Sequence, residues 1–157
     1  MFWLEFGVVH EGCVVNELSR AVPNVRLICP GGFILNEHSA DEIIALDGPT
    51  EAEVEAVLEV LQSSGSIAES SLVERTAVKA FVHLRSSAAP AVGYCSQAVE
   101  RNRCFRIGQE IQHEGVEQWR VGCRDRSNAE GLIEDLKEMG DLRYHKISEV
   151  SSEELIA

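Results

Sequence analysis

An α+β fold made of two tandem ferredoxin-like units, each a β-α-β-β-α-β arrangement with an antiparallel sheet, is what this sequence predicts. The first observation behind this prediction is that short apolar segments and segments of helical spacing follow the same order in both halves of the chain. The second is that a shift of 75 residues superimposes the apolar face of the clearest helix in each half. The 45% apolar and 25% charged residues are typical of a folded globular chain.

The first half is expected to hold four strands and two helices. Its clearest element is a helix between Thr50 and Gly65, because Thr50 and Glu53 have the spacing of a capping box and Gly65 is a natural helix stop. Turn residues and short apolar runs delimit the other elements. In order, these are a strand at 2–9, a helix at 13–21, a strand at 25–29 that resumes at 33–35 beyond a bend, a strand at 41–46 and a strand at 67–74.

The second half is expected to repeat this order. Ser127 and Glu130 again have capping-box spacing, and Gly140 is the expected stop of the helix that follows them. The other expected elements are a strand at 77–84, a helix at 91–99, a strand at 104–112, a strand at 116–123 and a strand at 142–150.

The repeat defines the expected domain organisation. The 75-residue shift also places Phe6 on Phe81 and Gly65 on Gly140. We therefore predict a first unit at 1–75, a second unit at 76–150 and a polar linker or tail at 151–157. A sheet covered by helices on one face needs a partner, so we expect the two sheets to pair within the chain or across a homodimer.

The charge of the chain excludes one class of partner. The 26 acidic residues exceed the 14 basic ones and leave a formal net charge of −12, which repels phosphate backbones. The first residues lack a basic n-region, and no apolar run approaches the length of a membrane span. We expect a soluble cytoplasmic protein that has no membrane partner and does not bind DNA through these residues.

Five cysteines without a C-x-x-C pair argue against a disulfide framework. His10 and Cys13 form H-x-x-C, and with Cys29 or Cys104 they are candidates for binding zinc or haem iron. The alternative is a turn histidine beside a buried thiol. The sequence does not identify the metal or any other cofactor.

Two further patterns provide candidate site residues. Cys95 and Cys123 are redox-switch candidates, since Arg124 and Arg126 could lower the pKa of Cys123, although alternation within a strand more often buries such a thiol. Pro30, Gly31 and Gly32 could present backbone N–H groups to an anionic or carboxylate ligand. A bulge or hairpin bend is the alternative there.

Five segments, spread over nearly the whole chain (residues 4–150), share the pattern of a known family: Asn16 to Pro23, Ile43 to Val54, Leu72 to Leu84, Glu117 to Arg126 and Leu132 to Gly140. Together they resemble the N-terminal region of archaeal transcription regulators of the bacterio-opsin activator type. The resemblance implies a region that senses a ligand or assembles the protein, followed by a DNA-binding helix-turn-helix domain. No basic helical pair follows here, so binding to DNA would need a C-terminal domain outside these residues.

The resulting expectation is a non-catalytic sensory or assembly region of a transcription regulator, with a possible small-molecule effector. No nucleophile elbow such as G-x-S-x-G is present, so we do not expect an enzyme. Two alternatives stay open. One is an ACT-like module that binds an amino acid between paired units, and the other is a small enzyme with a reactive cysteine or histidine.

Overall fold

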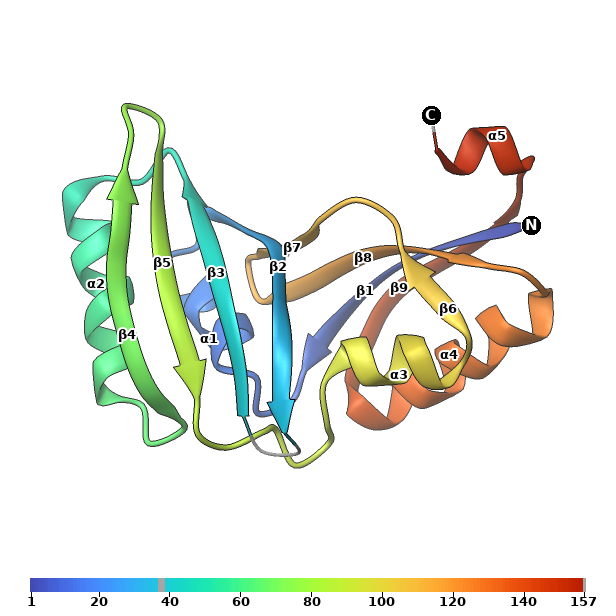
Figure 1. The fold of residues 1–157 in the computed structure, drawn as a ribbon, viewed down its shortest axis with the longest axis horizontal. Helices are drawn as coiled ribbons and strands as arrows, with labels where there is room; N and C mark the ends of the chain where they lie inside the picture. The colour runs from blue at the N-terminus through green and yellow to red at the C-terminus, as the bar shows by residue number, and fades with distance from the viewer. Residues whose placement is uncertain (37–38, 157) are drawn as a thin grey trace.

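A computed structural model describes residues 1–36 and 39–156, and within these residues it contains nine strands and five helices (Figure 1). All the pairings are antiparallel, so the predicted α+β class with an antiparallel sheet is confirmed. The elements are β1 (Phe2–His10), α1 (Val14–Ala21), β2 (Arg26–Asn36), β3 (Ser39–Asp47), α2 (Glu51–Ser63), β4 (Ile67–Arg75), β5 (Lys79–Ser86), α3 (Cys95–Arg101), β6 (Cys104–Arg106), β7 (Glu110–His113), β8 (Val116–Cys123), α4 (Arg126–Met139), β9 (Gly140–Glu149) and α5 (Ser152–Leu155).

The sheet is continuous, and its strand order is β4-β5-β3-β2-β7-β8-β1-β9, with β6 paired to β8 beside this path. We call β2, β3, β5 and β4 the first half-sheet, and β7, β8, β1 and β9 the second half-sheet. The two join where Leu27 to Cys29 of β2 pair with Glu110 to Gln112 of β7.

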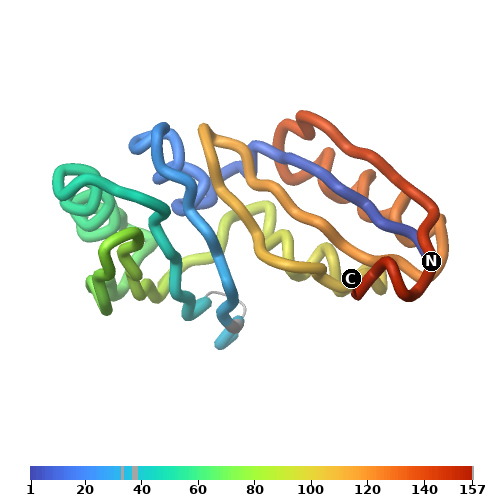
Figure 2. The backbone as a smooth tube through the Cα atoms, turned by 90° about the horizontal axis from the view of Figure 1, so that it is seen from above, coloured from blue at the N-terminus to red at the C-terminus, as the bar shows by residue number. Residues whose placement is uncertain are grey.

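The sheet does not confirm two units built from consecutive elements. The N-terminal strand β1 lies between β8 and β9 in the second half-sheet (Figure 2), and β5 lies between β3 and β4 in the first (Figure 1). Each half-sheet thus contains the strand that, by chain order, would begin the other unit. The expected boundary between residues 75 and 76 stays a prediction.

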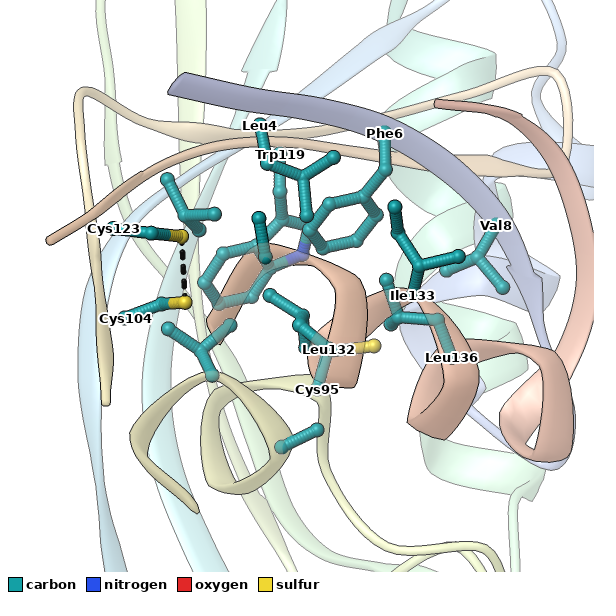
Figure 3. Close-up of a cluster of buried hydrophobic side chains, with 14 of the residues drawn as sticks. Leu4, Phe6, Val8, Cys95, Cys104, Trp119, Cys123, Leu132, Ile133 and Leu136 are labelled. Atoms are coloured by element: carbon teal, nitrogen blue, oxygen red, sulfur yellow. Dashed lines mark hydrogen bonds between the residues drawn. The ribbon is translucent and has the colours of Figure 1, made fainter. Parts of the chain in front are cut away.

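Two hydrophobic cores correspond to the two half-sheets. The first joins α1 and α2 to β2, β3 and β5, and the second joins α3 and α4 to β1 and β8. Phe6 and Trp119 stack in the second core with ring centroids 6.2 Å apart (Figure 3). Helix amphipathicity explains this placement, because the apolar faces predicted for α2 and α4 are the faces that are buried.

Local sequence signals are confirmed at several element boundaries. Thr50 Oγ1 accepts a hydrogen bond from the Glu53 backbone N–H at 3.1 Å, and Glu53 Oε1 accepts one from the Thr50 N–H at 2.9 Å. The pairing of β2 with β3 shifts register between Ile28 and Gly31, as the bulge interpretation predicted.

Other boundaries differ from the prediction. The strand expected at 104–112 is interrupted, so it forms β6 and β7, and Gly108 lies between them with a φ of 71°. The helix expected at 91–99 begins at Cys95. Helix α4 begins at Arg126 with Asp125 as its N-cap, which places Ser127 inside the helix and excludes it from the predicted capping role.

Residues near the C-terminus form the short helix α5 after Ser151, whose side chain accepts a hydrogen bond from the Glu154 N–H. In the described part of the chain, the helices lack the combination of length and apolarity that a membrane crossing demands.

Candidate functional site

A pocket of about 490 Å³ opens at the junction of the two half-sheets. Strands of both half-sheets line it, together with the N-terminal residues of α1 and α3. Among the described residues, the ionisable side chains that line the pocket are His10, Cys13, Cys29, Asp41, Glu42, Tyr94, Cys95, Glu100, Arg106, Glu110 and Glu117.

The strands deliver these polar groups on the same faces that build the hydrophobic cores. Alternate residues of a strand share a face, so His10 follows the buried row of Leu4, Phe6 and Val8 in β1. Glu117 likewise precedes Trp119 and the rest of the buried row of β8. The core-facing rows therefore change from apolar to polar where they reach the pocket.

His10 is buried between two hydrogen-bond acceptors. Its Nε2 lies 2.8 Å from the Gly93 carbonyl oxygen, and its Nδ1 lies 3.0 Å from Glu117 Oε2. Burial opposes the charged form, but the hydrogen bond and the charge of Glu117 outweigh it, so the pKa of His10 is raised. This geometry favours an imidazolium that donates from both nitrogens.

Glu117 is the matching anion. Its Oε1 accepts a hydrogen bond from Trp119 Nε1 at 2.8 Å, and its Oε2 faces His10. Burial alone would raise the pKa of Glu117, but the hydrogen bonds from His10 and Trp119 lower it below its usual value. Glu117 is therefore held as a carboxylate inside the protein.

Two further carboxyl groups in the pocket, those of Glu42 and Glu110, have no such cation as a partner among the described residues. Desolvation, followed by the charge of Glu117, raises the pKa of Glu42 to about 7. The same two causes, together with the charge of Glu42, raise the pKa of Glu110 well above its usual value, although Gln112 Nε2 donates a hydrogen bond to Glu110 Oε1 at 2.8 Å. Both groups resist ionisation because they are desolvated and, in addition, lie near other carboxylates.

The pocket thiols are poor nucleophiles in this environment. Burial raises the pKa values of Cys13, Cys29 and Cys95 well above the ordinary value for a thiol, and nearby carboxylates add to this rise. Cys13 nevertheless belongs to a compact donor group. One ligand atom from each of His10, Cys13 and Glu117 lies within 4.8 Å of the other two.

The structure thus brings together part of the set expected from the sequence. His10 and Cys13 lie in one cluster, and Cys29 lines the same pocket, whereas Cys104 belongs to the second core. Cys123 has Cys104 as its neighbour, with their sulfur atoms 2.6 Å apart (Figure 3), whereas Cys95 lines the pocket. The contact with Cys104 and burial raise the pKa of Cys123, although Arg124 and Arg126 were expected to lower it. A redox-switch role for Cys95 or Cys123 stays a prediction.

The Pro30-Gly31-Gly32 segment lies at the pocket margin. Gly31 and Gly32 line the pocket, and the Pro30 carbonyl accepts a hydrogen bond from Arg106 Nη2 at 2.9 Å. A Cβ at position 32 would meet the Asp41 carbonyl oxygen of β3 at 2.6 Å, so close strand packing accounts for that glycine. A ligand-binding role for the three residues stays a prediction.

Sequence reasoning missed Glu42, Glu110 and Glu117. In a chain with 26 acidic residues, acidity by itself carries no signal. The informative signal is the position of the residue within a strand, because Glu42 and Glu117 are in phase with the buried residues Ile44 and Trp119. An acidic residue on the buried face of a strand needs a partner or a function.

Comparison with known proteins identifies a family. The family model described as HVO_2525_N, N-terminal, matches residues 3–142. The chain belongs to this family. The family's name is an archaeal one, which agrees with the archaeal part of the resemblance, but nothing in the match links it to bacterio-opsin activators.

The matched region contains the whole donor group, since His10, Cys13 and Glu117 all lie within it. The pocket is therefore part of the family domain itself. No curated protein and no solved structure matches the sequence.

Proposed function

We propose that this domain is the sensory region of an archaeal-type transcription regulator and that its pocket binds a cationic effector. The observation that carries the proposal is the convergence of Glu42, Glu110 and Glu117 on one pocket between the half-sheets. Among the described residues that line it, the cationic side chains are His10, which Glu117 engages, and Arg106, which is exposed. A bound cation would let the remaining carboxyl groups ionise.

A sensory role also suits the place of the pocket in the fold. Ligand contacts from both half-sheets would change how the two are held together, and such differential contacts are what shift a conformational equilibrium. The family description as an N-terminal domain supports a partner domain that reads the signal. In this proposal, DNA is bound by a separate helix-turn-helix domain, because a net charge of −12 repels it here.

A second candidate is the ACT-like binding of an amino acid. Arg106 is the observation that favours it, because this side chain lies at the pocket margin beside the Pro30 carbonyl. A free amino acid could place its ammonium group on the carboxyl side and its carboxylate on Arg106. We propose no catalytic role, because burial makes the pocket thiols weak nucleophiles.

The test is a thermal-shift series on the purified chain with an alkyl diamine, divalent metal ions, a neutral amino acid and a dicarboxylate. A ligand that binds only the folded state raises Tm, so the diamine or the metal ions should raise it and the dicarboxylate should not. Glu110→Gln should reduce the shift, whereas Glu130→Gln on the exposed surface of α4 should leave it unchanged.

Each outcome has a defined meaning. A shift with the amino acid alone would support the second candidate. No shift with any cation, or an equal shift with the dicarboxylate, would contradict the proposal.

A further inference from the structure

Three different donor types meet at one end of the pocket. His10 is the last residue of β1, Cys13 is the N-cap residue of α1, and Glu117 is in β8. Their ligand atoms lie within 4.8 Å of one another, although Glu117 is 107 positions from His10 in sequence. An imidazole, a thiol and a carboxylate are the three side-chain groups that bind Zn²⁺ in proteins.

The orientation of His10 already suits a metal ligand. A histidine that binds a metal through one ring nitrogen usually donates its other N–H to a carbonyl or carboxylate oxygen. Nε2 of His10 makes such a contact with the Gly93 carbonyl at 2.8 Å, which leaves Nδ1 facing Glu117. The rest of the chain therefore fixes the ring with one nitrogen toward the donor group.

Glu117 is held in a similar way. Trp119 Nε1 donates to Oε1 at 2.8 Å, so Oε2 is the oxygen that faces His10. Side chains that orient ligands in this manner typically affect metal affinity by about 10- to 100-fold. The supporting contacts are thus in place on both sides of the cluster.

We propose that His10 Nδ1, Cys13 Sγ and Glu117 Oε2 bind a divalent transition-metal ion of the zinc class. This inference deepens the proposed function and rests on it, because it names the cation of the same pocket. Thiolate and imidazole donors select zinc-like ions over Mg²⁺ and Ca²⁺, which prefer oxygen ligands alone.

Binding is an exchange of protons for a metal ion. The proton between Nδ1 and Glu117 and the proton of the Cys13 thiol pass to solvent, while the neutral imidazole, the thiolate and the carboxylate each give an electron pair to the ion. Oxidation states do not change. Three protein ligands leave a coordination position for water or for an effector in the pocket.

The test uses the full chain, freed of metal with a chelator, desalted under reducing conditions and titrated with Zn²⁺ by calorimetry and with Co²⁺ by absorption spectroscopy. The wild type should bind one ion per chain, and the Co²⁺ form should show a sulfur-to-cobalt charge-transfer band. Cys13→Ser should weaken Zn²⁺ binding by at least about tenfold and abolish that band. Cys104→Ser, which removes a thiol of the second core, should retain both.

Cys13→Ser is the decisive variant. His10→Ala or Glu117→Gln would leave a buried charge without its partner, and this could unfold the protein. A wild type without stoichiometric Zn²⁺ binding, or a Cys13→Ser variant that binds Zn²⁺ as tightly as the wild type, would overturn the metal assignment. If a diamine still raises Tm while Zn²⁺ and Co²⁺ do not bind, only this inference is wrong. If neither the ions nor the diamine bind, the proposed function is wrong as well.

Discussion

Among individual residues, Glu42 is one whose protonation the fold controls. Its pKa is raised from 4.5 to about 7 by desolvation and by the charges of Glu117 and Asp41. The folded state therefore holds this proton to a higher pH than the unfolded state does. The stability that the protonated form contributes is complete below about pH 4.5 and is lost as the pH rises through about 7.

Glu42→Gln should remove this pH dependence. We expect the variant to match the wild type near pH 5 and to become the more stable protein near pH 8, by at most on the order of 3 kcal/mol. Urea unfolding with a chelator present measures the difference, and the chelator keeps metal binding out of the comparison. A constant difference between the two proteins across this pH range would contradict the expectation.

Cys104 and Cys123 are a pair of neighbouring cysteines that lies outside the pocket. They are register partners on β6 and β8, and their sulfur atoms lie 2.6 Å apart. The hydrogen bond from Cys123 lowers the pKa of Cys104, whereas burial raises the pKa values of the three pocket thiols. Cys104 and Cys123 are thus the two described cysteines best placed to form a disulfide with each other.

Treatment with diamide should join Cys104 to Cys123 in a disulfide. The two thiols lose two hydrogen atoms, which diamide accepts as it is reduced to the hydrazine. Peptide mapping by mass spectrometry should find this link and leave Cys13, Cys29 and Cys95 reduced. Cys104→Ser should form no intramolecular link, and a disulfide between Cys95 and Cys123 in the wild type would contradict the prediction.

At the scale of elements, two glycines that look equivalent in the sequence have different roles. Gly65 and Gly140 coincide under the 75-residue shift and follow the helices α2 and α4. A Cβ at position 140 would overlap the carbonyl oxygen of Val9 in β1, whereas a Cβ at position 65 meets open space. Gly140 is therefore required by strand contact, and Gly65 is not.

Alanine substitution should separate these two roles. Gly140→Ala should destabilise the protein by about 1 to 3 kcal/mol, because the backbone of β9 must move away from β1. Gly65→Ala is the matched control and should change stability by less than about 0.5 kcal/mol. Urea unfolding curves measure the free energy of unfolding of the two variants. Equal changes in the two would contradict the view that the contact with Val9 requires glycine at position 140.

Elements were predictable to the extent that local chemistry determines them. The capping box of Thr50 and the alternation of β1 and β8 depend on neighbours in sequence, so their signals are readable there. Only part of the pocket could be predicted from the sequence. The H-x-x-C motif is local, but Glu117 joins His10 through strand pairing across 107 positions, which no local pattern records.

At the scale of the whole molecule, each half-sheet contains the first strand of the other half of the chain, β1 or β5. We call this arrangement the exchange of β1 and β5, and no local sequence pattern predicts it. Both strands carry a buried apolar row with the same two-residue spacing, so this spacing does not indicate which of them pairs with β3 and which with β8. The 75-residue shift placed Phe6 on Phe81, yet Phe6 is fully buried and Phe81 lies out of phase with the buried Val82 and Leu84. The choice between the two positions is made by long-range packing.

The exchange predicts that neither half of the chain folds alone. A fragment of residues 1–75 lacks β5, which lies between β3 and β4, and a fragment of residues 76–157 lacks β1, which lies between β8 and β9. Each fragment would then expose a split sheet and an open core. We expect both fragments to lack a cooperative thermal transition by circular dichroism, and their mixture to recover the spectrum of the intact chain.

A matched control cuts the chain at the same boundary, but only after the intact protein has folded. A protease site inserted at residues 76–78, in the exposed turn between β4 and β5, lets the intact protein be cut after it has folded. The cut protein should stay associated in size-exclusion chromatography, because β1 and β5 each pair with strands on the other side of the cut. Cooperative unfolding of either fragment by itself would contradict this prediction. It would mean that each half can complete its own sheet, with β1 taking the place of β5 in the first half-sheet.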